Sequence, residues 1–505
     1  MTSGLTVLIS LALLFAIPAP LSAADITVGG EIRIRGRYRQ DRDFDKTNLP
    51  TSLDRARLDE RSRIRVSAKI DEGLSAYLEL ESYGRFGFGA SSPQANTEDT
   101  FGREGAGVPA FRFAWIDARL PATPVTFRLG RQPLAFGHGY VFDTQIYGGD
   151  AITARGPLFG WNWEIGWVKT RESDITGFAR DYPSGYAQPG ATPGLAAGAG
   201  TAGTGTPGVD NDEEYFTFKI KGSPATDHVL ELYSVTHRDA GIFVTPIGPS
   251  ASAPYGSQSG GGAFEDTIGV AWNARLGPFV PRAEVAYQFG TAYKLAVPRR
   301  DGGNTVTRSA YMFHLGTDYN LTPQWRISLD AALGSGNGKN PTDPDFKDNH
   351  AFFQVNPYPN VVQWPFAADL DTPGSFNMGN GVTNRRFEVN GLNDLGFVDL
   401  AVAWTPLQQW TFRVEATKLF AHRTFDGMGG IATTKPPRNL GWNLGGDVTY
   451  RPYRNLTTNW VATVWIPGRY FDGGIPAPTP AQLGGKPGPR GDTAIILRWY
   501  ALVSF

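Results

Sequence analysis

A strict alternation of side-chain character follows position 24, and it restricts this part of the chain to extended structure. In residues 25–39, the even positions are apolar or glycine, whereas most odd positions from Glu31 onward carry arginine. Residues 58–70 repeat the pattern, with arginine or lysine at positions 61, 63, 65 and 69. A period of two with opposite character on the two faces predicts β-strands that have one apolar side.

Similar segments recur along the chain and predict about eighteen strands. They lie at 25–39, 58–70, 74–84, 111–120, 125–136, 149–156, 161–171, 213–221, 227–237, 265–276, 280–292, 308–319, 324–335, 394–405, 409–420, 440–451, 456–466 and 493–505. Short connections such as 71–73 alternate with long ones such as 171–213. This alternation predicts an all-β fold, a transmembrane antiparallel β-barrel with short periplasmic turns and long extracellular loops.

Composition agrees with such a barrel and removes several other classes of protein. The 505 residues include 48 acidic and 47 basic side chains, so no overall basic surplus favours nucleic acid as a partner. Cysteine is absent, which excludes disulfides and thiolate metal sites. A single large barrel is compatible with this length.

The two ends of the chain predict export to the bacterial outer membrane. Residues 5–23 form an uncharged apolar run that ends in small residues, so we expect residues 1–24 to be a cleaved signal peptide. Residues 25–505 would then form one outer-membrane domain, surrounded by lipid and lipopolysaccharide. Aromatic residues beside the short turns, such as Tyr319 and Trp325, predict a membrane interface, and the last strand ends in Phe505.

The basic side chains on the polar faces are the candidate functional residues. A charge that faces lipid at mid-depth costs roughly 2–4 kcal/mol, so these faces must turn toward the lumen. The side chains that we expect to line the pore and contact solute are Arg33, Arg35, Arg37, Arg61, Arg63, Arg65, Lys69, Arg128, Arg155, Lys219, Arg282, Arg326, Arg413 and Arg498.

Two interpretations of these basic residues remain open at the level of sequence. They could form ion-pair ladders with inward carboxylates, which would brace the wall without touching solute. Alternatively, they could form an electropositive channel. Local imbalance favours the second interpretation, because the first two strands present many arginines against Glu31, with Glu79 and Glu81 the nearest further partners.

No catalytic or metal-binding motif stands out. The six histidines, at 138, 228, 237, 314, 350 and 422, are dispersed, and no two lie at a metal-ligand spacing. We therefore expect no enzyme activity, no catalytic residues, no metal site and no cofactor.

Two segments resemble the alginate-export family of outer-membrane proteins: LDERSRIRVSAKI at 58–70 and FRLGRQPLAFGHGYVFD at 127–143. The resemblance implies an eighteen-stranded monomeric barrel with an arginine-lined pore that moves an anionic polysaccharide or other anionic solutes outward. Arg61, Arg63, Arg65, Arg128 and Arg131 lie in the matching segments, although strand parity turns Arg131 toward lipid. The chain differs from the family late in its sequence, where the turn at 451–456 is short.

The expected function is therefore a passive, anion-preferring outer-membrane channel. Its solute would be an anionic polysaccharide or a smaller anion, and periplasmic export proteins are possible partners. One alternative is a general diffusion porin whose long loops fold inward to narrow the pore. Another is an outer-membrane enzyme or adhesin that uses the barrel as a scaffold.

Overall fold

The structure is a computed structural model. It describes residues 24–40, 55–84, 110–145, 148–171, 213–239, 243–245, 258–260, 262–294, 301–337, 347–350, 352, 392, 394–424, 437–469 and 493–505. The expected signal peptide, apart from its last residue, lies outside this part of the chain. Among the described residues, no helix has the length and apolar character needed to cross a bilayer.

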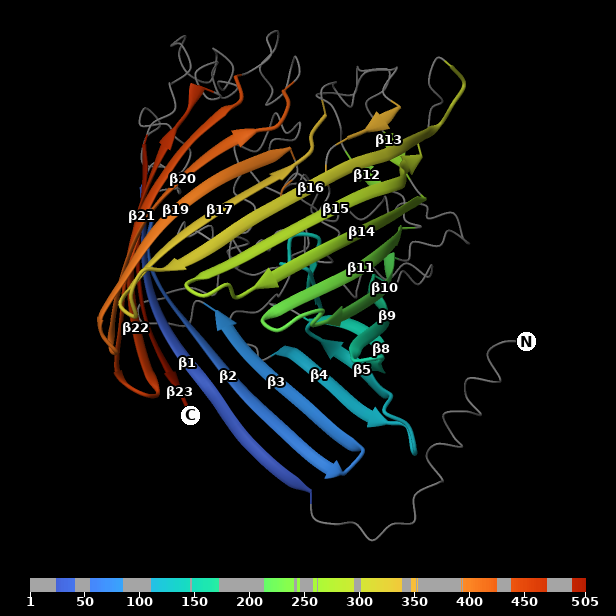
Figure 1. Cartoon of the computed structure of the whole chain (residues 1–505), viewed down its shortest axis with the longest axis horizontal. Helices are drawn as coiled ribbons and strands as arrows, with labels where there is room; N and C mark the ends of the chain where they lie inside the picture. The colour runs from blue at the N-terminus through green and yellow to red at the C-terminus, as the bar shows by residue number, and fades with distance from the viewer. Residues whose placement is uncertain are drawn as a thin grey trace, which may run out of the picture.

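Eighteen antiparallel strands form a closed barrel, as the sequence predicts (Figure 1). They are β1 (Asp25–Gln40), β2 (Arg55–Asp71), β3 (Leu74–Gly84), β4 (Ala110–Arg119), β5 (Thr126–Gln132), β8 (Gly149–Leu158), β9 (Trp161–Arg171), β10 (Glu213–Gly222), β11 (His228–Asp239), β14 (Ala263–Ala274), β15 (Phe279–Lys294), β16 (Thr305–Asn320), β17 (Trp325–Gly334), β19 (Leu395–Leu407), β20 (Trp410–Ala421), β21 (Asn439–Tyr453), β22 (Leu456–Pro467) and β23 (Ala494–Ser504). Each pairs with its neighbours along the chain, and β23 pairs with β1 to close the ring.

Phe505 extends the pairing of β1 with β23 that closes the ring. Phe505 and Gly30 exchange two backbone hydrogen bonds, of 2.9 and 3.0 Å. A Cβ atom on residue 30 would lie 2.7 Å from the ring of Phe505, so glycine is needed where this ring crosses β1. The terminal aromatic residue therefore packs directly on the seam between the first and last strands.

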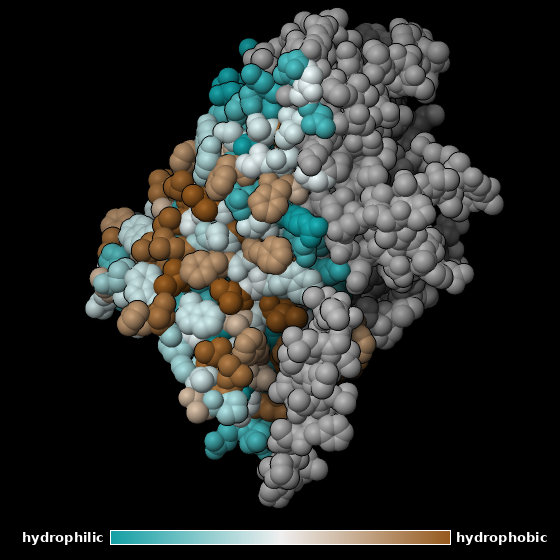
Figure 2. Space-filling view, turned by 90° about the vertical axis from the view of Figure 1, so that its right-hand side faces the viewer, coloured by the Kyte–Doolittle hydropathy of each residue, from teal (hydrophilic) through white to brown (hydrophobic). Residues whose placement is uncertain are grey.

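Strand parity separates an apolar outer face from a charged inner face. Ile26 and Val28 are more than 60% exposed on the outside, whereas Glu31 and Arg35 on the other face of β1 are buried. Figure 2 shows the outward apolar side chains as a band, with hydrophilic residues beyond it at both ends. An apolar band on the outside of a closed barrel is the surface that a bilayer covers.

Aromatic rings gather beside the short turns, as expected for a membrane interface. Trp325 stacks on Trp404 with ring centroids 5.6 Å apart, and Trp410 stacks on Tyr450 at 4.2 Å. These pairs flank the turns that connect β16 to β17, β19 to β20 and β21 to β22.

One predicted strand is shorter in the structure than the sequence indicates. The strand expected at 125–136 ends at Gln132, before Pro133, which has no backbone N–H to continue the ladder. The chain then enters a loop that contains a small hairpin, β6 (Ala135–Phe136) with β7 (Phe142–Asp143). Of three further short strands, β12 (Phe243–Thr245) and β13 (Gln258–Gly260) pair with each other, and β18 (Asp348–Asn349) pairs in parallel with residues near the start of β16.

Candidate functional site

The predicted arginines of the first strands form a continuous ladder inside the barrel. We define the arginine ladder as Arg33, Arg35, Arg61, Arg63, Arg65 and Arg112, together with Glu31, Glu79 and Glu81. Antiparallel pairing of β1 with β2 and of β2 with β3 places these residues side by side, with Glu31 opposite Arg63 and Arg65 opposite Glu79. The side chain of Arg37 lies outside the described part of the chain.

Glu31 is the centre of the ladder. Its carboxylate accepts hydrogen bonds from Arg61 at 2.6 Å, Arg63 at 3.0 Å and Arg65 at 2.8 Å. Three guanidinium groups that share one carboxylate are close like charges, and a single anion only partly offsets their repulsion.

The two other carboxylates of the ladder are shared in the same way. Glu79 accepts hydrogen bonds from Arg65 at 2.9 Å and from Arg112 at 2.5 Å, and Glu81 accepts one from Arg63 at 2.6 Å. Arg112 reaches this position because it is the extra residue where the register of β4 shifts against β3. Sequence analysis did not select Arg112, because its even position does not share the odd parity of its neighbours on β4.

The ladder combines features of both interpretations of the arginines. Its ion pairs brace the wall, and the four arginines at positions 61, 63, 65 and 112 share three carboxylates. Arg65 retains 35% side-chain exposure toward the lumen, so its guanidinium group remains accessible to solute.

A second arginine pair lies on β5 and β8. Arg128 binds both oxygens of Asp117 at 2.8 Å, and Arg155 binds the same carboxylate at 3.2 Å. Arg128 also lies over the ring of Trp115, 4.5 Å from its centroid. Here too, two arginines share one acid.

The remaining predicted pore residues are more dispersed. Three of them form ion pairs: Lys219 with Glu164, Arg282 with Asp318 and Asp330, and Arg413 with Asp399 and Glu415. Arg498 is half-buried. Lys69 and Arg326 are exposed near the short turns. Arg131, which parity turns outward, pairs at 2.8 Å with Asp150, whose side chain is 57% exposed. It shares the outer face with Leu129 and Ile152.

A loop after β5 folds into the barrel and packs on the wall opposite the ladder. We call residues 133–145 the inner loop. Phe136 and Phe142 from its hairpin pack edge to face at 5.4 Å, and Phe142 makes a similar contact with Tyr215 of β10. These buried rings belong to a hydrophobic cluster that holds the inner loop against the wall.

Two wall carboxylates bind the backbone of the inner loop. The N–H of Gly137 donates to Glu231 at 2.7 Å, and the N–H of His138 donates to Glu284 at 2.7 Å. On the other side, Arg112 of the ladder donates to the backbone oxygen of Gln145 at 2.6 Å. Hydrogen bonds therefore connect the inner loop both to the arginine ladder and to the wall opposite it.

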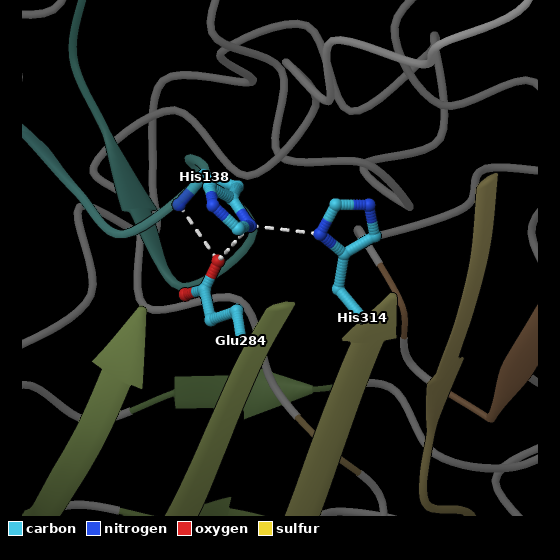
Figure 3. Close-up of side chains that lie close together, drawn as sticks. All are labelled: His138, Glu284 and His314. Carbon is cyan, nitrogen blue, oxygen red and sulfur yellow. Dashed lines mark hydrogen bonds and ion pairs between the residues drawn. The ribbon is translucent and has the colours of Figure 1, made fainter. Parts of the chain in front are cut away.

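The contact between the inner loop and the wall brings together three side chains that sequence analysis did not connect. His138 of the inner loop points toward His314 of β16, and both lie above Glu284 of β15 (Figure 3). The two Nδ1 atoms are 2.8 Å apart, and Nδ1 of His138 is 3.3 Å from Glu284 Oε2. Positions 138 and 314 are 176 residues apart, so no local motif could indicate this cluster.

Burial in the barrel interior affects titratable groups of the inner loop. It lowers the pKa of His138 to about 4, with a further contribution from the charge of neighbouring His314. Burial also raises the pKa of Asp143 to about 6, although a hydrogen bond from the backbone of Gln145 opposes this change. His138 is therefore neutral at physiological pH.

An apolar outer band, a charged lumen and a loop folded inside a closed antiparallel ring define an outer-membrane β-barrel of the channel-forming type. Comparison with known sequences then assigns the family: the profile described as Gram-negative porin matches residues 7–345, and the chain belongs to this family. A porin is a channel, which agrees with the expectation that the chain is not an enzyme. No curated protein sequence matches the chain.

Several solved structures are similar to this one at low sequence identity. OccK3 (OpdO) of Pseudomonas aeruginosa is 9% identical, with 95% of this chain and 96% of that chain covered and a TM-score of 0.48. OccK11 (OpdR) of the same organism is 9% identical, with 96% of each chain covered and a TM-score of 0.46. The outer membrane channel DcaP of Acinetobacter baumannii is 12% identical, with 97% and 100% covered and a TM-score of 0.41.

Proposed function

We propose that this porin is an anion-preferring channel whose selectivity originates in the arginine ladder. The observation that supports the proposal is that four arginines of the ladder, on β2 and β4, share the three carboxylates of Glu31, Glu79 and Glu81, while Arg65 keeps 35% of its side chain exposed. A cationic surface in a hydrated lumen concentrates anions, and guanidinium groups bind carboxylates or phosphates through paired hydrogen bonds. Partial neutralisation by the shared carboxylates keeps each binding step weak enough for release.

The test measures ion selectivity in planar bilayers. The purified protein is reconstituted, and the reversal potential is recorded across a potassium chloride gradient for the wild type and for Arg61→Gln, Arg63→Gln and Arg65→Gln. Each variant removes one positive charge, so the anion-to-cation permeability ratio falls, and the triple variant shows the largest change.

Arg131→Gln is the matched control. This arginine also pairs with one acid, but on the outer face of the barrel. Its removal leaves the reversal potential unchanged. A ladder triple variant that conducts with unaltered selectivity would leave the channel as a general diffusion porin and the ladder as a brace of the wall.

The proposal extends to anionic polysaccharide as a solute, because the segments at 58–70 and 127–143 resemble alginate-export proteins. A polyuronate chain that enters the pore would bind several ladder arginines at once and block the ionic current. Block by polyuronate, but not by a neutral polysaccharide of equal length, supports this extension. Equal block by both polymers contradicts it.

We further propose that residues 1–24 are removed on export and that residues 25–505 form one monomeric domain in the outer membrane. Surrounding lipid and lipopolysaccharide would cover the apolar band, and periplasmic proteins could deliver the solute. Mass spectrometry of the mature N-terminus and sizing of the purified protein test these points. A mature chain that retains residues 1–24 would contradict the first.

A further inference from the structure

We propose that His138, Glu284 and His314 form a binding site for one divalent transition-metal ion of the Zn²⁺ type, which clamps the inner loop to the barrel wall (Figure 3). This site is separate from the proposed anion selectivity. It takes one ligand from the inner loop and two from neighbouring strands, β15 and β16.

The spacing of the three side chains suits a small ion with nitrogen and oxygen ligands. Their ligand atoms all lie within 4.8 Å of one another. Zinc binds imidazole nitrogen and carboxylate oxygen at about 2.0–2.2 Å, which places ligand atoms of a tetrahedral site about 3.3 Å apart. The 3.3 Å from His138 Nδ1 to Glu284 Oε2 already matches this value, and the 2.8 Å between the two Nδ1 atoms needs only a small opening.

The hydrogen bonds of the two imidazoles strengthen the argument. Nε2 of His138 faces the oxygen of Asn273 at 3.2 Å, and Nε2 of His314 faces a carboxylate oxygen of Asp330 at 3.1 Å. Both Nε2 atoms therefore donate hydrogen, and a neutral imidazole then carries a lone pair on Nδ1. The 2.8 Å hydrogen bond between the two Nδ1 atoms holds one proton between them, beside a carboxylate oxygen of Glu284, and a metal ion would replace that proton.

The surroundings fix the ligands as they are fixed in known metal sites. Glu284 is 1% exposed, Tyr233 donates to its Oε1 at 2.5 Å, and the backbone N–H of His138 donates to its Oε2 at 2.7 Å, so both oxygens are fixed and Oε2 keeps a second lone pair for an ion. A second partner on each ligating histidine sets its tautomer and ring orientation in metalloproteins. Asn273 and Asp330 occupy this position for His138 and His314.

The ligand types select the metal. Imidazole favours zinc, copper, cobalt and nickel, whereas calcium and magnesium prefer sites made only of oxygen ligands. Three protein ligands also leave one position for water. Because His138 belongs to the inner loop and the other two ligands to the wall, a bound ion joins two parts of the lumen that are otherwise connected by hydrogen bonds and apolar contacts.

The experiment measures metal binding directly in the full-length folded barrel. Protein in detergent, stripped with a chelator, is titrated with Co²⁺, whose visible absorption reports tetrahedral nitrogen and oxygen ligands, and then with Zn²⁺ in competition. We expect one ion per chain at micromolar concentration, displacement of Co²⁺ by Zn²⁺, and no displacement by the same concentration of Ca²⁺ or Mg²⁺.

Variants assign the site. His138→Ala and His314→Ala are expected to weaken binding by at least about 100-fold, and Asn273→Ala by about 10-fold, because Asn273 orients a ligand without touching the ion. His228→Ala is the matched control, since it removes a histidine near the short turns, and it leaves binding unchanged. Retention of the heat-modifiable folded form on gels shows that each variant still forms a barrel.

Two results would overturn the proposal. If the wild-type barrel binds neither Co²⁺ nor Zn²⁺ at micromolar concentration, the two histidines are an ordinary hydrogen-bonded pair that shares a proton. If binding survives in both His138→Ala and His314→Ala, the ion lies elsewhere. Neither readout depends on conduction, so the result is independent of the anion-channel proposal.

Discussion

Replacement of Glu31 by glutamine is expected to increase anion selectivity, the opposite of the effect of removing an arginine. Glu31 is 7% exposed and accepts hydrogen bonds from three arginines of the ladder. Glutamine has nearly the same shape but no charge, so the four arginines that share three carboxylates would be left with two.

The size of the effect follows from Coulomb's law. One added charge about 7 Å from a permeating ion in water changes its energy by about 0.6 kcal/mol, and screening at 0.1 M salt leaves about half of this. A monovalent anion then enters about 1.7-fold more readily and a cation about 1.7-fold less. The anion-to-cation permeability ratio is therefore expected to rise about threefold.

The assay is the reversal potential of the reconstituted Glu31→Gln variant, recorded at low and at high ionic strength. At 1 M salt the screening length falls to about 3 Å, and the difference from the wild type is expected to vanish. Asp150→Asn is the matched control, because it removes a carboxylate that pairs with one arginine on the outer face.

Stability is measured on the same samples to separate structure from selectivity. Each charge-assisted hydrogen bond to Glu31 contributes about 1.5–3 kcal/mol to the unfolding free energy. In the variant, the amide oxygen of glutamine and water still accept hydrogen bonds from the arginines. We therefore expect the unfolding free energy to fall by only about 2–4 kcal/mol. A folded variant with an unchanged or lower anion preference at 0.1 M salt would refute the reasoning that places the ladder on the conduction path.

Two further predictions concern the ends of the strands. Burial raises the pKa of Asp394 to about 7, so the folded state binds more protons than the unfolded state between about pH 4 and 7, and stability falls by up to about 4 kcal/mol as pH rises through this range. The Asp394→Asn variant keeps the oxygen that accepts from the N–H of Arg423 but cannot titrate. Its unfolding free energy, measured in urea at several pH values, is therefore expected to lose this pH dependence. A pH dependence that persists in the variant would belong to another group. Deletion of Phe505 removes two backbone hydrogen bonds to Gly30 and the ring on the seam, so we expect unfolding at lower urea concentration, and an unshifted midpoint would argue against a role in closure.

The wall of the barrel could be predicted almost residue by residue because its signal is local. A side chain that faces lipid must be apolar, and one that faces the lumen need not be, so each strand carries its own period of two. β9 begins at Trp161 and ends at Arg171, as the sequence predicts, and β3 agrees equally well at Leu74–Gly84. The largest difference is at Pro133, where the pattern continues past the end of β5, whereas β2 and β16 begin three residues earlier than predicted, at Arg55 and Thr305.

The contacts inside the barrel could not be predicted, since they join residues far apart in the sequence. Arg112 enters the ladder through a register shift, which a strict alternation cannot reveal. The cluster of His138 with His314 exists only because the inner loop reaches β15 and β16 inside the barrel. The sequence places each histidine in a strand or a loop, but it does not encode locally which residue of the opposite element it meets.

The division of charge within the lumen explains why the ladder, rather than the whole wall, is the candidate for selectivity. On the side of β11 and β15, Glu231 and Glu284 are buried and their oxygens already bind the backbone of the inner loop. Substitution there is expected to release the loop, which changes conductance more than selectivity. On the side of β1 and β2, Arg65 is still exposed after its ion pairs have formed. Under the proposed function, a conducted anion meets fixed guanidinium groups on one side and a loop anchored by hydrogen-bonded carboxylates on the other, and measurements of conductance and reversal potential separate the two contributions.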